Sequence, residues 1–431
     1  MLKEYVQKKM ERLVREYFAR HRVRLIVVVG GAGKTTTKTA IATVLSEKFR
    51  VRMEDGNHNT WLSVPPALLG VKYPEGKTHS PLAWHRVFRA MRERIKQPTD
   101  VDVIVQELGT DHPGEIAHFG TYLRADIAVL TSVVPEHMEF FGTMEAVARE
   151  ELSVGEYSNI LFINRDDVDA KYAEFLTTER IDTYGVNADA EYNFEYSDYR
   201  PLEGFTGNFV SPELGKVPTS VNLLGEHNLR AGVVAGAMGV KLGMSAAEIS
   251  AGIAKIQSVP GRMNVLRGVR GTTIIDDTYN SSPAAAEAAL RTLYAVEAPQ
   301  RIAILGSMNE MGEMSADAHA EVGQFCDPTL LEYVVTIGRD AEQYLAPAAR
   351  SVGNRVKIFD NPIEAGAFVN KVMQPGAVIL AKGSQNGVFA EEAVKILLHS
   401  TADQEKLVRQ SLHWMNVKHD TFRKAYDEVE Q

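Results

Sequence analysis

A glycine-rich segment near the N-terminus has the residue types of a phosphate-binding loop. After five apolar residues at 25–29 it reads Gly30-Gly31-Ala32-Gly33-Lys34-Thr35-Thr36. Glycines let backbone N–H groups turn toward phosphate oxygens, and a following helix adds the positive end of its dipole. Lys34 can reach the β- and γ-phosphates, and the Thr35 hydroxyl can bind magnesium. The segment predicts a nucleotide site but not a reaction, because kinases, GTPases, partition ATPases and ATP-driven ligases all use such a loop.

Other residues suited to phosphate chemistry follow apolar runs or a chain break. Glu107 comes just after the run 103–105, and His137 follows the run 127–130. Ligands gather at the carboxyl edge of a parallel sheet, where a carboxylate can hold magnesium. Arg262 follows the helix-breaking segment 258–261, so closure of two domains would bring it to the γ-phosphate. Asp277 is expected to act across the same cleft, on the nucleotide or on Lys34.

Short apolar runs alternate with helix-like stretches along most of the chain. The first set lies at 25–29, 103–105, 127–130 and 160–163, and the second at 273–275, 302–305, 333–337, 356–359 and 377–381. This alternation is typical of β-α-β units, so we predict an α/β protein with two mostly parallel sheets. Residues 181–222 lack a helical period and are expected to form short strands and loops. Residues 228–257 have a helical pattern.

These patterns suggest three parts: a helix at 1–24, a nucleotide-binding domain at 25–258 and a second α/β domain at 259–431. Apolar residues recur at helical spacing in the first segment, which carries eight basic and three acidic side chains. A basic amphipathic helix can touch a membrane surface. More often such a helix packs on its own domain and keeps its charges in water, and we favour that interpretation.

The composition is that of an ordinary globular protein. The 431 residues include 47 Lys and Arg against 56 Asp and Glu, a formal charge of −9, and 45% are hydrophobic. The single cysteine, Cys326, rules out an internal disulfide and a cysteine zinc cluster. No apolar run approaches the ~20 residues of a membrane span, and no secretory signal is evident. We therefore expect a cytoplasmic enzyme that neither inserts stably into membranes nor uses nucleic acid as its main partner.

Eight segments in order resemble the Mur ligase superfamily, over roughly residues 25 to 395. They are the loop 30–38, Glu107 to Ile116, Pro135 to Thr143, Gly225 to Asn228, Pro260 to Met263, Asp276 to Pro283, and Leu305 to Glu313 followed by Lys382 to Ser384. The resemblance implies a P-loop ATPase domain followed by a Rossmann-like domain. It also implies an ATP- and Mg²⁺-dependent ligase that forms an amide bond through an acyl phosphate.

The resemblance also assigns roles to individual residues. His137 would hold a second magnesium, and Asn228 would lie near the adenine, although a helix N-cap is a competing role for it. Tyr279 and Asn280 would contact the nucleotide, as would the loop from Gly30 to Thr36. The residues implied in substrate contacts are Asn59, His112, Lys382 and Ser384. The segment 276–283 favours a D-alanyl-D-alanine-adding type that acts on a cell-wall precursor carboxylate, with small molecules or peptides as partners.

The sequence departs from the family at three places. Family members carry an N-terminal domain that grips the UDP end of the substrate, whereas about 24 residues precede the loop here. Ala231 replaces an asparagine near the adenine. Glu151 stands where relatives have a carbamylated lysine that holds the second magnesium, and we expect its carboxylate to be a metal ligand instead.

Other functions stay open at this point. A ligase that adds a different amino acid, or a polyglutamate-type synthase, has the same chemistry. The missing domain and the missing lysine instead favour a nucleotide-binding module, or a partner-dependent subunit, that has lost ligation. The joint presence of Lys34, Glu107, His137, Arg262 and Asp277 favours an active ligase. The oligomeric state is not predicted.

Overall fold

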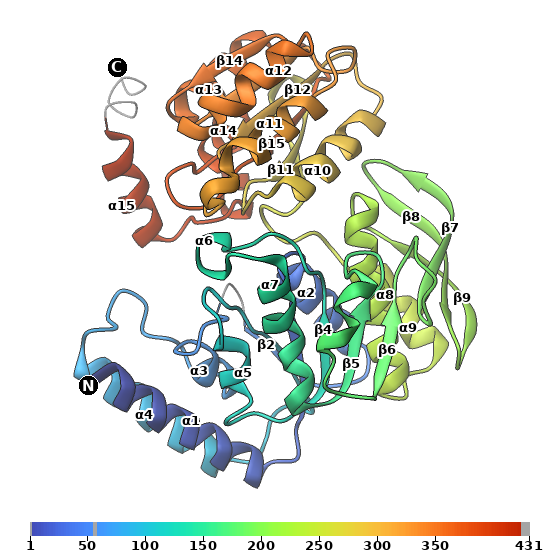
Figure 1. Cartoon of the computed structure of the whole chain (residues 1–431), viewed down its shortest axis with the longest axis vertical. Coiled ribbons are helices and arrows are strands. Elements are labelled where there is room, and N and C mark those ends of the chain that lie inside the picture. The colour runs from blue at the N-terminus through green and yellow to red at the C-terminus, as the bar shows by residue number, and fades with distance from the viewer. Residues whose placement is uncertain (1, 55–57, 424–431) are drawn as a thin grey trace. The chain divides into compact units, whose positions relative to one another are not determined.

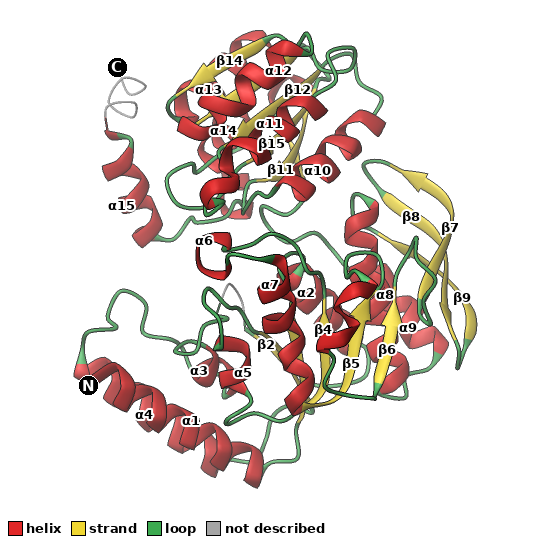
Figure 2. Ribbon diagram, in the orientation of Figure 1, coloured by secondary structure: helices red, strands yellow, loops and turns green. Residues whose placement is uncertain are grey.

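The computed structural model describes residues 2–54 and 58–423. The chain divides into two compact units. The first consists of Met1–Tyr199, Phe205–Asn222 and Asn228–Gln257, and the second of Arg200–Gly204, Leu223–His227 and Ser258–Gln431. Helices and strands alternate in both units (Figure 2).

The first unit is built on a six-stranded sheet in which all neighbouring strands are parallel (Figure 1). Its strands in spatial order are β2 (Val51–Met53), β3 (Val103–Glu107), β1 (Arg24–Val29), β4 (Ala125–Leu130), β5 (Ser158–Asn164) and β6 (Ile181–Tyr184). The predicted parallel sheet is confirmed. Val28 pairs with Glu107 and Val29 with Leu130. The carboxyl ends of β3 and β4 therefore lie on either side of the point where the glycine-rich loop begins.

Helices and a small second sheet complete residues 2–254. The helices are α1 (Leu2–Arg20), α2 (Lys34–Leu45), α3 (Val64–Leu68), α4 (Pro81–Lys96), α5 (Glu115–Phe119), α6 (Met138–Phe141), α7 (Met144–Leu152), α8 (Glu226–Lys241) and α9 (Ala246–Ala254). The pattern at 228–257 forms two helices rather than one, because Gly243 has a left-handed φ of 75°. The region 181–222 holds strands, as predicted: β6 and the sheet β7 (Asn193–Arg200), β8 (Gly204–Ser211) and β9 (Gly215–Val221).

Helix α1 packs on the first unit as the sequence favoured. Its apolar face is buried in the main hydrophobic core, through residues that include Val6, Met10 and Tyr17. The same core receives Trp84 and Met91 of α4. Within the described residues, no helix combines the length and the apolar character needed to cross a membrane.

The second unit contains the other predicted sheet. Its order is β10 (Asn264–Arg267), β11 (Thr273–Asp277), β15 (Val378–Lys382), β12 (Arg301–Gly306), β13 (Tyr333–Ile337) and β14 (Val356–Phe359). All pairs are parallel except β10 with β11, and β10 was not predicted. The helices are α10 (Pro283–Ala295), α11 (Ser315–Phe325), α12 (Ala346–Ser351), α13 (Pro362–Val372), α14 (Glu391–Leu397) and α15 (Leu412–Thr421). Asp277 and Lys382 are register partners at the carboxyl ends of β11 and β15.

Candidate nucleotide site and the β11 loop

The glycine-rich loop is held tightly against the end of β4. Gly30 has a φ of 121°, and a Cβ placed on it would lie 2.3 Å from the Thr131 hydroxyl oxygen. The amides of Gly31 and Ala32 donate to the backbone oxygen and the hydroxyl of Ser132, at 3.1 and 2.8 Å. These contacts require glycine at position 30 and fix the loop as it enters α2 at Lys34.

The Lys34 side chain folds back over this loop. Its ammonium donates to the Gly30 carbonyl at 2.5 Å and lies 3.5 Å from Glu136 Oε2. The side chain is 12% exposed, so the charge is within reach of a ligand. The strand–loop–helix arrangement with this lysine fits a phosphate group by geometry and charge.

Thr35 and Glu107 form a pair of oxygen donors beside the loop. The Thr35 hydroxyl donates to Glu107 Oε2 at 2.9 Å, and Asn59 Nδ2 donates to Glu107 Oε1 at 3.0 Å. The buried Lys38 ammonium lies 3.8 Å from Glu107 Oε2 and donates to the Glu54 carbonyl. The structure thus brings Asn59 to the predicted metal position, and it adds Lys38, to which the sequence analysis gave no role.

Glu151 and Glu150 are adjacent on α7 but make different contacts. Glu151 Oε2 accepts from the Gly30 amide at 2.8 Å, so this carboxylate contacts the phosphate loop itself. Burial raises the pKa of Glu151 to about 7, against the lowering effect of the Lys34 charge. Glu150 instead accepts from the amides of Gly114 and Ile116, at the start of α5. Only Glu151 is therefore placed for a role in the site.

His137 lies close to two carboxylates, one of which also faces Lys34. Its Nε2 lies 3.3 Å from Asp111 Oδ1 and 3.7 Å from Glu136 Oε1, and Glu136 Oε2 faces Lys34. Asp111 and Glu136 lie inside the segments that resemble the family, but the sequence gave them no role of their own. The exposed His112 ring packs at a tilt against the Phe140 ring, with 4.3 Å between the ring centroids.

In the second unit the predicted residues meet at the carboxyl ends of β11 and β15. Lys382 Nζ lies 2.6 Å from Asp277 Oδ2 and donates to the Asn280 carbonyl at 2.9 Å. Asp277 Oδ1 accepts from the Met263 amide. Ser384 donates its hydroxyl to the Ser281 carbonyl and accepts from the Asn309 amide. Asp277, Asn280, Lys382 and Ser384 therefore lie around one segment, residues 277–281, which we call the β11 loop.

The Tyr279 ring of the β11 loop has two guanidinium groups close to it. Arg262 lies 4.2 Å from the ring centroid and Arg409 lies 5.7 Å from it. Arg409 also donates to the carbonyls of Thr278 and Tyr279, at 2.7 and 3.1 Å, and pairs with the fully buried Glu391. Arg409 lies outside every segment that resembled the family, so no sequence signal pointed to it.

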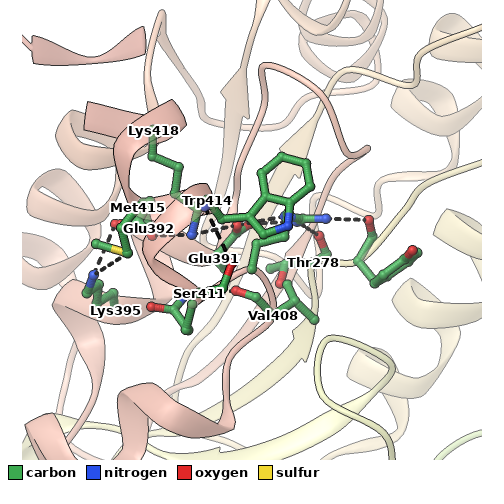
Figure 3. A network of polar contacts seen from close by, with 12 residues as sticks. Thr278, Glu391, Glu392, Lys395, Val408, Ser411, Trp414, Met415 and Lys418 are labelled. Atoms are coloured by element: carbon green, nitrogen blue, oxygen red, sulfur yellow. Dashed lines mark hydrogen bonds and ion pairs between the residues drawn. The ribbon is translucent and has the colours of Figure 1, made fainter. Parts of the chain in front are cut away.

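The contacts of Arg409 continue into the C-terminal helix. The Lys418 ammonium on α15 lies 2.9 Å from Glu391 Oε1 and 2.7 Å from Glu392 Oε1 (Figure 3). Asp276, next to the β11 loop, is fully buried and accepts from the Gly261 amide and the Thr278 hydroxyl. Burial raises its pKa to about 7, and the charge of Glu391 adds to this effect.

Two further residues that the sequence predicted for the site, Thr36 and Asn228, lie on helices. Thr36 is buried in the first turn of α2, and Asn228 is buried on α8. In the part of the chain that the structure describes, no three His, Cys, Asp or Glu side chains converge as metal ligands. Magnesium does not require such a cluster, since it commonly binds one or two carboxylates, waters and substrate phosphates.

A phosphate loop on a parallel sheet, followed by a second α/β unit, is the organisation expected of the family that the motifs resemble. Two family models match the chain in that order: the Mur ligase middle domain at residues 28–239 and the Mur ligase, glutamate ligase domain at residues 261–385. The chain therefore belongs to the Mur ligase family.

Individual relatives extend the comparison over most of the chain. The chain is 25% identical over 403 residues to the UDP-N-acetylmuramoyl-tripeptide–D-alanyl-D-alanine ligase of Bacillus subtilis, covering 91% of this chain and 79% of the relative. It superposes on MurF from Acinetobacter baumannii with a TM-score of 0.73 at 22% identity, covering 92% and 79% of the two chains. The MurF ligase of Thermotoga maritima in complex with ADP gives 0.71 at 21% identity, covering 90% and 83%.

Proposed function

We propose that this protein is an ATP-dependent ligase that joins an amine to a carboxylate through an acyl phosphate. The observation that carries the proposal is the phosphate loop, with Lys34 over it and the Thr35–Glu107 pair beside it, in a chain that both Mur ligase models match. The ADP complex of the Thermotoga maritima relative supports the choice of an adenine nucleotide. We also propose a cytoplasmic location, because the composition favours it and it suits an enzyme that consumes ATP.

The proposed amine is D-alanyl-D-alanine or a similar dipeptide, and the proposed carboxylate belongs to a peptidoglycan precursor. The name of the Bacillus subtilis relative supports this pair of substrates. The segment Asp277 to Asn280 supports it too, because its resemblance was to the D-alanyl-D-alanine-adding type. Proposed substrate contacts are Asn59 and His112 in the first unit, and Lys382 and Ser384 in the second.

The reaction balances without covalent change to the protein. The substrate carboxylate attacks the γ-phosphorus of ATP, and the bond to the β-phosphate oxygen breaks to release ADP. The amine then attacks the acyl carbon, loses a proton, and inorganic phosphate leaves. Lys34 and Arg262 would neutralise the phosphoryl oxygens, since this chemistry depends mainly on positioning and charge. Asn228, Tyr279 and Asn280 are proposed to position the nucleotide.

Thr35 and Glu107 fit a magnesium ion. They place a hydroxyl and a carboxylate oxygen within 2.9 Å of each other beside the loop, and magnesium prefers such oxygen ligands. Asn59 and Lys38 would keep the Glu107 carboxylate oriented. Bound there, magnesium would neutralise the charge of the β- and γ-phosphates. His137 and Glu151 are proposed to serve a second ion.

The test is product formation. Full-length protein is incubated with MgATP, a set of candidate carboxylates and a set of amines, and mass spectrometry searches for a product lighter by one water than the sum of its substrates. Such a product with D-alanyl-D-alanine, together with release of phosphate, is the expected result. Nucleotide binding without any amide product from precursor carboxylates would contradict ligation and support the nucleotide-binding module instead.

A further inference from the structure

The positive charge of this protein is concentrated in two helices. Helices α1 and α4 together hold 11 Lys and Arg against four Asp and Glu, a net charge of +7. The whole chain has 47 against 56, so the remaining residues have 36 against 52, a net charge of −16. Folding does not require this segregation, because like charges placed together repel one another.

The two helices form one continuous surface. Helices α1 and α4 lie side by side (Figure 1), with the Lys9 ammonium 4.4 Å from the centroid of the Phe88 ring and His21 Nε2 3.0 Å from the Ile95 carbonyl oxygen. These contacts also show that the helices run in the same direction. Their apolar faces are buried in the core, and the opposite faces are exposed. The exposed basic residues of the pair, which we call the α1–α4 basic face, are Lys3, Lys8, Arg12, Arg15, Arg20, Arg86, Arg89, Arg92 and Lys96.

Acidic residues offset little of this charge. Glu4, Glu16 and Glu93 each pair with a basic residue of their own helix, at 2.7 to 2.9 Å. Glu11 is buried against His118. Most cations of the face therefore point into solvent. Exposed ion pairs such as those of Glu4, Glu16 and Glu93 contribute little to stability.

Two large apolar side chains are exposed at one end of the same surface. Tyr5, in the first turns of α1, is 57% exposed, and Leu82, in the first turn of α4, is 61% exposed. Because α1 and α4 run in the same direction, both residues lie at the N-terminal end of the pair. Tyrosine and leucine next to lysine and arginine are the residues that enter the interfacial region of a lipid bilayer.

We propose that the α1–α4 basic face binds the surface of a bilayer that contains anionic lipids. Helix α1 alone has 19 residues and is about 28 Å long, so the face is extended. Its apolar side is already used in the core, so the helices would lie on the headgroups with only Tyr5 and Leu82 entering them. A folded nucleic acid would also meet the charge, but it would leave Leu82 without a favourable environment.

The experiment is co-sedimentation of the full-length protein with phosphatidylcholine vesicles, with and without phosphatidylglycerol. A four-site variant (Lys8→Gln, Arg12→Gln, Arg89→Gln, Arg92→Gln) removes charge from the face. A control with the same number of changes (Lys171→Gln, Lys216→Gln, Arg350→Gln, Lys371→Gln) removes exposed charge elsewhere. Circular dichroism checks that both variants are folded.

We expect binding to the anionic vesicles alone, weakening as salt is added. Each basic residue near such a surface contributes about a fivefold gain in affinity, so the four-site variant should bind on the order of 600-fold more weakly, and the control within a few fold of wild type. A double variant, Tyr5→Ser with Leu82→Ser, should also bind more weakly than wild type, and the salt dependence of its binding should be unchanged. No binding at low salt, equal loss in both variants, or binding to duplex RNA but not to vesicles would each overturn the proposal.

Discussion

The ammonium of Lys418 lies 2.7 Å from Glu392 Oε1, and both side chains are almost completely buried. This pair joins α15 to α14 (Figure 3), and Lys418 also contacts Glu391. Removing one member of a buried pair leaves an uncompensated charge. Lys418→Met should therefore destabilise the second unit by about 3–5 kcal/mol in a denaturant titration. Lys406→Met removes a partly exposed pair with Asp403 and should change stability by less than about 1 kcal/mol.

The Arg409 contacts give a second prediction, about activity rather than stability. The guanidinium binds Glu391 together with the carbonyls of Thr278 and Tyr279. Contact with all three acceptors requires the several N–H donors that a planar guanidinium group presents. Arg409→Lys keeps the charge but cannot reproduce this geometry, so the β11 loop should shift. We expect kcat to fall about 10- to 100-fold, with a smaller loss of stability than Lys418→Met causes. Wild-type kcat in this variant would show that Arg409 only anchors the chain.

Lys34 provides the simplest test of the phosphate loop. Lys34→Ala removes a charge from a partly open position, so the fold should be retained. Loss of a comparable transition-state contact costs on the order of 10²- to 10³-fold in turnover, and phosphate release should fall accordingly. Lys371→Ala removes an exposed lysine of α13 and should leave the rate unchanged. ATP turnover near the wild-type rate in Lys34→Ala would contradict the assignment of the loop.

The strands and the phosphate loop were predictable because their signals are local. The apolar run 25–29 and the glycines that follow it specify a buried strand, a turn and a helix within a few residues. The strands β2 and β10 were missed because they are only three and four residues long and partly exposed, so neither shows an apolar run. The end of α8 was missed because a single left-handed glycine, Gly243, interrupts a pattern that otherwise continues.

The contacts that organise the two candidate sites join residues far apart in the sequence. Glu151 and Gly30 are 121 residues apart, and Arg409 and Tyr279 are 130 apart. The sequence does not show which backbone amides the adjacent Glu150 and Glu151 carboxylates contact. Only the packing of α7 shows that one carboxylate contacts the phosphate loop while the other contacts the start of α5. Such pairings depend on the tertiary fold, which no single segment encodes.

Asp276 predicts a pH dependence of stability. Its folded pKa, about 7, lies above the ordinary value near 3.8, so between these values the folded chain holds a proton that the unfolded chain has released. Stability contributed by this group is therefore present at low pH and is lost as pH rises toward 7, by about 1.4 kcal/mol for each unit of pKa shift. Asp276→Asn should remove this dependence, because its amide oxygen still accepts from Gly261.

The measurement is thermal unfolding of wild type and Asp276→Asn at a series of pH values. The unfolding temperature of the variant should rise relative to that of wild type as pH rises from about 4 to 7, the window set by the two pKa values. Asp360→Asn changes an exposed carboxylate and should follow the wild-type curve. Parallel curves for wild type and Asp276→Asn would mean that Asp276 is ionised throughout this range.

The Glu151 carboxylate is placed for two roles, which one substitution can distinguish. Its contact with the Gly30 amide positions the phosphate loop, and its charge is available to a second magnesium ion. Glu151→Gln keeps an oxygen that accepts from Gly30 but loses the negative charge. We expect this variant to fold normally and to require clearly more magnesium for half-maximal activity, because magnesium prefers charged oxygen ligands.

Glu156→Gln is the control, because it changes an exposed carboxylate on the next turn and should not alter the magnesium requirement. Activity should also be independent of bicarbonate, since no lysine needs carbamylation at this position. A Glu151→Gln enzyme with unchanged rate and magnesium dependence would restrict Glu151 to holding Gly30.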